Sequence, residues 1–182
     1  MRLTNFLLFF SSIFLWVHCQ SDNSQPSASL SKIAVTWKLI KNDVDESGDN
    51  RQFAAITLKN EGAIALTNNW TLYFNQLNGP LTGAITESKV AFKHINGDFY
   101  SLKPTDGFTL PAGKEKTIEF KGKYWATKKS DAPIGLYAVF TDKNGKASPP
   151  QPINNYTVAP FTKKEQVHRL SLIHISEPTR PY

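Results

Sequence analysis

The sequence is short of cysteine and of helical periodicity, and each shortage excludes a class of structure. Cys19 is the only cysteine among 182 residues, so no disulfide can form within the chain. No window of twelve or more residues repeats its apolar side chains at a spacing of 3.6, which argues against long helices. The sequence also lacks a nucleophile motif, a Cys/His metal spacing and a phosphate-binding glycine loop before a helix. We therefore expect no metal and no cofactor.

Acidic residues are the minority: 21 Lys and Arg stand against 15 Asp and Glu, for a formal net charge of +6. Such a surplus can indicate a polyanion partner. Here, however, lysine pairs such as Lys114/Lys116 and Lys121/Lys123 alternate with Glu115 and Glu119. This pattern is typical of a solvated strand face, and we expect no nucleic-acid partner.

Only one long apolar run is present, from Phe6 to Val17, and the basic Arg2 precedes it by a few residues. It is too short to span a bilayer, which needs about 20 residues. It predicts a secretory signal peptide over residues 1–19 and an exported protein. The polar stretch 20–30, which contains a proline, is interpreted as a flexible linker.

Cys19 follows the apolar run directly, which resembles a bacterial lipoprotein signal, although His18 stands where a small residue is usual. In that interpretation Cys19 is lipidated and anchors the protein to a membrane, facing the periplasm or the cell surface. The alternative is cleavage later, near Ala28, which would release a periplasmic or secreted protein.

The C-terminal residues 170–182 are interpreted as a non-native tail. The segment from Leu170 to Arg180 resembles the translation of a transposase adapter used in DNA library preparation. The alternative is a natural amphipathic tail. If residues 170–182 are adapter-derived, the native sequence is cut off near Arg169.

Between these ends the apolar residues alternate with polar ones, as they do in half-buried strands. Turn-forming residues separate the segments, for example at Asn96-Gly97 and Asn144-Gly145. The pattern predicts an all-β fold, an antiparallel two-sheet sandwich over residues 31–153. The residues expected to face the core are Ile33, Val35, Trp37, Leu39, Ala54, Ile56, Leu58, Val90, Phe92, Ile118, Phe120, Leu136, Ala138 and Phe140.

The stretch 68–80 carries three aromatic residues. Alternation places Trp70, Leu72 and Phe74 on one face and Thr71, Tyr73 and Asn75 on the other. Trp70 and Phe74 are expected in the core. Tyr73 is either a flat ring that stacks on a sugar or half of a cross-strand aromatic pair on a solvated face.

Several motifs in this region resemble the N-terminal domain of bacterial chitobiases, the β-N-acetylhexosaminidases of glycoside hydrolase family 20. They are W-T-L-Y-F at 70–74, H-I-N-G-D at 94–98, L-x-P-T at 102–105, L-P-A-G at 110–113 and Y-W at 124–125. The resemblance covers roughly residues 30–160, and residues 154–169 are similar to the linker towards the next domain. It implies an immunoglobulin-like β-sandwich, called a carbohydrate-binding domain, ahead of an α/β domain and a catalytic (β/α)8 barrel.

The catalytic Asp-Glu pair of that family has no counterpart here. The one adjacent pair, Asp45-Glu46, lies in a loop rich in Gly and Asn, and we interpret it as solvated. We therefore expect no catalytic residue in this chain.

Three functions follow from the resemblance. The first is the leading module of an exported hexosaminidase that acts on terminal N-acetylglucosamine or N-acetylgalactosamine. The second is a sugar-binding module, whose exposed aromatics we predict to be Tyr73, Tyr100, Trp125 and Tyr137. The third is a structural spacer that packs on the missing catalytic domains, in which these aromatics are buried.

Overall fold

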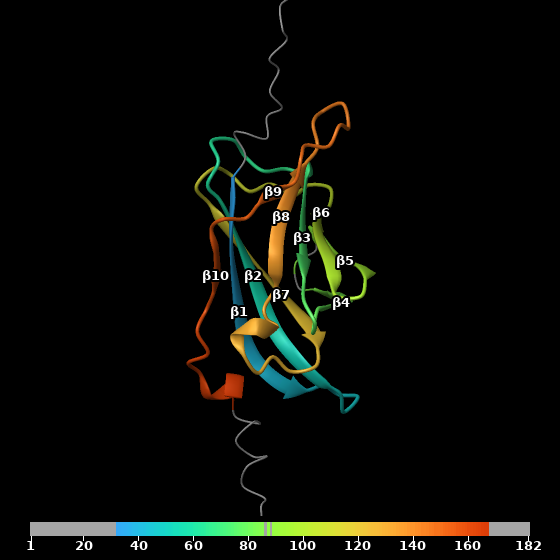
Figure 1. Ribbon diagram of the computed structural model, residues 1–182, viewed down its shortest axis with the longest axis vertical. Coiled ribbons are helices and arrows are strands. Elements are labelled where there is room, and N and C mark those ends of the chain that lie inside the picture. The colour runs from blue at the N-terminus through green and yellow to red at the C-terminus, as the bar shows by residue number, and fades with distance from the viewer. Residues whose placement is uncertain (1–31, 86, 88, 168–182) are drawn as a thin grey trace, which may run out of the picture.

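The computed structural model describes residues 32–85, 87 and 89–167. They form two five-stranded sheets packed face to face (Figure 1). The first sheet has the order β10-β1-β2-β7-β4 and the second β5-β6-β3-β8-β9. The strands are β1 (Ile33–Val44), β2 (Asn50–Asn60), β3 (Trp70–Asn75), β4 (Pro80–Ile85), β5 (Val90–Asn96), β6 (Phe99–Pro104), β7 (Glu115–Lys123), β8 (Ile134–Phe140), β9 (Gln151–Pro152) and β10 (Tyr156–Val158).

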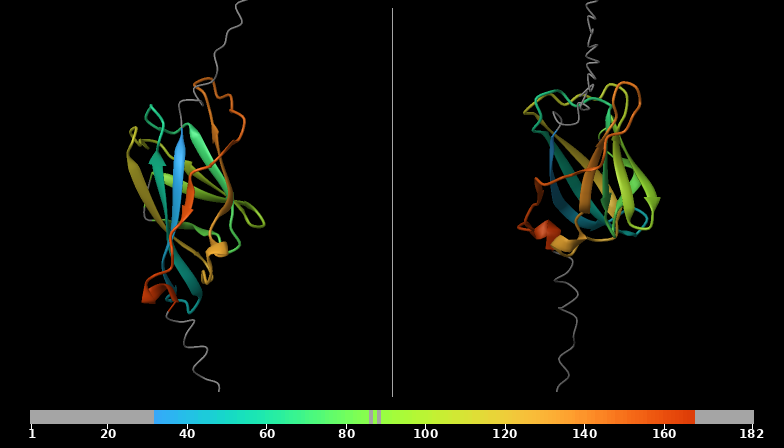
Figure 2. Two further views of the ribbon diagram at one scale, coloured as in Figure 1. Left: turned by 60° about the vertical axis from the view of Figure 1, so that its left-hand side comes forward. Right: turned by 45° about the horizontal axis from the view of Figure 1, so that its top comes forward.

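The predicted all-β sandwich is confirmed. Neighbouring strands are antiparallel except at one edge, where β10 runs parallel to β1. A short 3-10 helix, η2 (Lys129–Asp131), interrupts the connection between β7 and β8. The two views of Figure 2 show the layers from other sides.

Every residue that alternation placed in the core is buried, and Trp37 and Trp70 are among the largest of them. Aromatic rings join the two sheets: Phe92 of β5 meets Phe120 of β7 with ring centroids 4.9 Å apart. Edge-to-face contacts of this kind add stability beyond the area they bury. The core thus fixes which face of each strand points outward.

Residues 154–167, which the sequence predicts to be a linker, instead pack along the first sheet. Tyr156, Thr157 and Val158 pair with β1, and the Phe161 ring lies 6.2 Å from that of Trp37. The Gln166 side chain is buried and donates to the Leu39 carbonyl. The folded unit therefore extends beyond the predicted boundary at residue 153. The domains expected after it stay a prediction.

Several predictions lie outside the described residues: the signal peptide at 1–19, lipidation of Cys19, the linker at 20–30 and the tail at 170–182. Within the part of the chain that the structure describes, no helix is long and apolar enough to cross a membrane.

Candidate functional site

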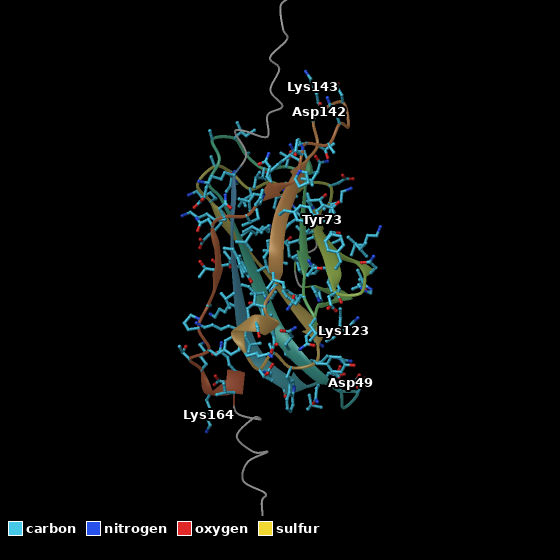
Figure 3. The ribbon with its side chains drawn as sticks, viewed as in Figure 1. Asp49, Tyr73, Lys123, Asp142, Lys143 and Lys164 are labelled. Atoms are coloured by element: carbon cyan, nitrogen blue, oxygen red, sulfur yellow. The ribbon has the colours of Figure 1, made fainter. Side chains whose placement is uncertain are left out.

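Three aromatic rings gather on the outer face of the second sheet. Tyr73 of β3 is the strand partner of Tyr137 of β8. Phe99 of β6 is the strand partner of Asn75, so it lies diagonally across from Tyr73. The Tyr73 ring centroid is 5.0 Å from that of Tyr137 and 5.7 Å from that of Phe99, with interplanar angles of 16° and 19°. We call these three residues the aromatic face. Figure 3 labels Tyr73 on this sheet.

The aromatic face offers both apolar surface and polar edges. All three side chains are half-buried, so their rings are held by the sheet but still reach solvent. Near-parallel planes at these distances are offset stacks, which cover only part of each ring. The Thr71 side chain, half-buried, and the Asn75 side chain, exposed, lie on the same face of β3.

The phenol of Tyr137 stays neutral well above pH 7. Desolvation by burial raises its pKa, and the neighbouring Tyr73 raises it further. A neutral phenol both donates and accepts hydrogen bonds. The aromatic face can therefore offer the exposed parts of its apolar rings together with hydroxyl groups to one ligand.

Tyr100 was predicted to be exposed, and that prediction is wrong. It is only 1% exposed, and its ring stacks on Phe74 in the core with centroids 6.0 Å apart. Tyr100 is paired with Phe74 across the sheet, so both point inward. It also shares the alternation of Leu102, which is buried, and this spacing of two was the signal that could have placed it.

Trp125 is half-buried but belongs to another part of the molecule. It follows β7, and its indole Nε1 donates to the Asp43 carbonyl at 2.9 Å. Its own carbonyl accepts from the Asn78 amide at 2.8 Å. These bonds give Trp125 a structural role at the end of the sandwich. The four predicted aromatics thus do not form one site: Tyr73 and Tyr137 meet, whereas Tyr100 and Trp125 lie elsewhere.

Phe99 is the member of the aromatic face that the sequence did not reveal. A β-bulge between His94 and Asn96 shifts the register of β5 against β6 just before Phe99. Because of this bulge, the face of Phe99 cannot be assigned from the residues of β5 that precede the turn. The alternation within β6 carried the signal, because counting back by two from Lys103 and Ser101 places Phe99 on the outer face.

The Asp45-Glu46 pair lies in a loop, as predicted, but only Glu46 is exposed and Asp45 is half-buried. It lies in the hairpin between β1 and β2, where Asp45 accepts from the backbone of Ser47 and Asp49 and pairs with the Arg51 guanidinium at 2.8 Å. The Asp49 backbone bond, with help from Arg51, lowers the pKa of Asp45. A carboxyl held ionised in a turn is not a general acid.

Among residues 32–167, where described, no three His, Cys, Asp or Glu side chains come together to hold a metal. A cavity of about 660 Å³ opens between the sheets near the β9 edge, and none of the predicted aromatics lines it. Its walls include Ile33, Phe140, Pro152, Ile153 and Asn155.

Comparison with known proteins identifies a matching family. Residues 32–169 match the family model CHB_HEX, described as "Putative carbohydrate binding domain". N,N'-diacetylchitobiase of Vibrio harveyi is 28% identical over 83 residues, which are 45% of this chain and 9% of that protein. Beta-hexosaminidase of Vibrio vulnificus is 30% identical over 92 residues, or 50% of this chain and 11% of that protein.

A solved structure shares the fold. The GH20 exo-β-N-acetylglucosaminidase from Vibrio harveyi, crystallised with N-acetylglucosamine, superposes with a TM-score of 0.53 at 21% identity. The superposition covers 71% of this chain and 18% of the enzyme. The chain therefore matches only a small share of the length of its relatives.

Proposed function

The chain belongs to this carbohydrate-binding domain family, as its motifs predicted, and from that premise we propose that it is the leading module of an exported β-N-acetylhexosaminidase. The parent enzyme would remove terminal N-acetylglucosamine or N-acetylgalactosamine from oligosaccharides. The described residues supply no catalytic pair, so hydrolysis belongs to domains that follow. The contribution of this module is to bind sugar.

The aromatic face is the observation that carries the proposal. Stacked rings on an outward sheet face, half-buried and edged by hydroxyl and amide groups, suit the apolar face and polar rim of an acetamido sugar. A sheet supports the rings more rigidly than a loop would. Little conformational entropy is then lost when a ligand binds.

The test measures binding of the domain to chitooligosaccharides by calorimetry. Tyr73→Ala and Tyr137→Ala should each weaken binding about fivefold or more, since one aromatic contact contributes about 1 kcal/mol. Tyr137→Phe keeps the ring and removes only the hydroxyl, so it measures the contribution of the hydroxyl to binding. Tyr124→Ala is the matched control, because Tyr124 is 64% exposed and lies away from this face. Equal affinity for all four variants and the parent chain would refute sugar binding here.

The spacer function remains the second candidate, and one observation favours it. The three rings cover part of one another and are half-buried, so they also stabilise the sheet on their own. Under this alternative, Tyr73→Ala lowers the thermal midpoint while no sugar binds the parent chain. Binding and stability must therefore be measured on the same samples.

Export and anchoring complete the proposal. A lipidated Cys19 would hold the enzyme at a membrane facing the periplasm or the cell surface. Labelling with a fatty acid should mark the parent chain and not a Cys19→Ser variant. Sequencing the source gene past the codon for Arg169 tests the parent enzyme: we expect several hundred further codons with an adjacent Asp-Glu pair.

A further inference from the structure

One row of side chains crosses the outer face of the second sheet from edge to edge. Lys93 of β5 is the strand partner of Ser101 of β6, which is the partner of Tyr73 of β3. Tyr73 is in turn the partner of Tyr137 of β8, and Tyr137 is the partner of Pro152 of β9. Strand partners point to the same face of a sheet, so the row is continuous and includes two residues of the aromatic face. Figure 1 shows β5, β6, β3 and β8 side by side in this order.

The strands of the second sheet carry positive charge without negative charge. Lys93 and Lys103 are their only lysines, and the five strands contain no arginine, aspartate or glutamate. In the first sheet, by contrast, the lysines of β7 alternate with Glu115 and Glu119. The balanced charge of a solvated strand face therefore describes the first sheet and not the second.

The two lysines lie next to each other at one end of the row. Lys103 is the strand partner of Ala91, so it lies diagonally across from Lys93 on the same outer face. Both lysines are exposed, and neither forms an ion pair within the part of the chain that the structure describes. The carboxylates nearest to them along the chain, Asp98 and Asp106, lie in the turns before and after β6. Two ammonium groups thus stand beside the aromatic face without a carboxylate partner.

One extended ligand can reach both the lysines and the rings. Neighbouring strands lie about 4.8 Å apart, so the backbone of Lys93 is about 10 Å from that of Tyr73 and about 19 Å from that of Pro152. Ser101, between Lys93 and Tyr73, has the smallest side chain of the row and is only 5% exposed. It therefore does not separate the lysines from the rings, and an oligosaccharide that lies across the strands can contact both.

We propose that the second sheet binds acidic glycans. The aromatic face holds sugar rings, and Lys93 and Lys103 bind an anionic substituent of the same oligosaccharide. This inference rests on the proposed function, in which the aromatic face binds sugar, and it adds the class of sugar. A lysine ammonium is a compact point charge with three rotatable donors, so it accepts a carboxylate or a sulfate alike.

The test compares three chitotetraoses: a neutral one, one that carries a single sulfate and one that carries a single carboxylate. In calorimetry at low salt, both anionic ligands should bind about fivefold more tightly than the neutral one, a modest gain because exposed ion pairs are weak. Sodium chloride at about 1 M should remove this gain, because the Debye length is then only about 3 Å.

Variants assign the gain to the two lysines. Lys93→Gln combined with Lys103→Gln should abolish it and leave the affinity for neutral chitotetraose unchanged, which also shows that the sheet is intact. Lys59→Gln is the matched control, because Lys59 is an exposed lysine on β2 of the first sheet. This control should keep the full gain.

The outcomes separate this inference from the proposed function. Suppose that neutral chitotetraose binds and that Tyr73→Ala weakens its binding. If the anionic ligands then bind no more tightly, or if the double lysine variant keeps the gain, the acidic-glycan inference is refuted while the proposed function stands. If none of the three ligands binds, both fail. Single-stranded DNA that binds as tightly as the sulfated ligand would reveal a general polyanion surface and also refute the inference.

Discussion

Gly79 gives the sharpest test of how the core is packed, because its role is steric. The residue lies between β3 and β4 and does not have the positive φ that would by itself require glycine. A Cβ there would lie 2.7 Å from the Tyr100 hydroxyl oxygen and closer still to ring atoms Cε2 and Cζ. Gly79→Ala therefore forces the Tyr100 ring to move.

The Tyr100 ring has little space to move into. It is 1% exposed, stacks on Phe74 and touches the His94 ring at 4.9 Å between centroids. Overpacking a core costs about 1–3 kcal/mol, and with neighbours on several sides we expect about 2–3 kcal/mol. At an unfolding entropy of about 2.1 cal/mol/K per residue, a domain of roughly 130 residues loses about 9 °C in its thermal midpoint.

A double-mutant cycle assigns the loss to this contact. Tyr100→Leu alone removes a buried ring and destabilises the domain by about 2–4 kcal/mol. In the Gly79→Ala background it should cost at least 1 kcal/mol less, because the smaller side chain relieves the clash. Urea unfolding of the four proteins measures this coupling. A loss below about 0.5 kcal/mol for Gly79→Ala, or strict additivity, would refute the packing described for Tyr100.

Two further predictions concern the C-terminal segment. The Tyr156 hydroxyl is buried with no hydrogen-bond partner among the described residues, and burial raises the pKa of this phenol. The folded state therefore holds the phenol proton more tightly than the unfolded state, so the free energy of unfolding is at its full value below about pH 10 and falls at higher pH. Tyr156→Phe should reduce this fall and leave the free energy of unfolding at pH 7 unchanged, as measured by urea titrations at several pH values. An alkaline loss as large in the variant as in the parent chain would contradict this assignment. Gln166→Ala removes the side chain that donates to the Leu39 carbonyl, so it should lower the free energy of unfolding by about 1–3 kcal/mol. It should also speed amide hydrogen exchange in β10, and unchanged exchange there would argue against a packed C-terminal segment.

The fold was predictable because the core repeats with the period of a strand. Ile33, Val35 and Trp37 are buried, whereas the residues between them are half-buried or exposed, and a shift of the strand register by one residue would expose all three at once. The turns carried similar information: Gly97 and Gly145 have the positive φ that their Asn-Gly pairs predicted. Gly79 did not follow this rule, because a distant ring and not the local backbone requires it.

The candidate site was predictable only in part. Tyr73 and Tyr137 were placed correctly outward by alternation, but their contact depends on β3 and β8 being neighbours. No local pattern in the sequence reveals that strand order, because at least 59 positions separate the residues of β3 from those of β8. The same applies to residues 154–167: only the fold brings Gln166 to Leu39, 127 positions away.

The central claim is that the aromatic face binds sugar, and amide chemical shifts test it most directly. We would titrate the isotope-labelled domain with a chitooligosaccharide and follow its backbone spectrum. We predict saturable shifts confined to β3, β6 and β8 around Tyr73, Phe99 and Tyr137. An unchanged spectrum at millimolar sugar, or shifts confined to the cavity beside Ile33 and Ile153, would contradict it.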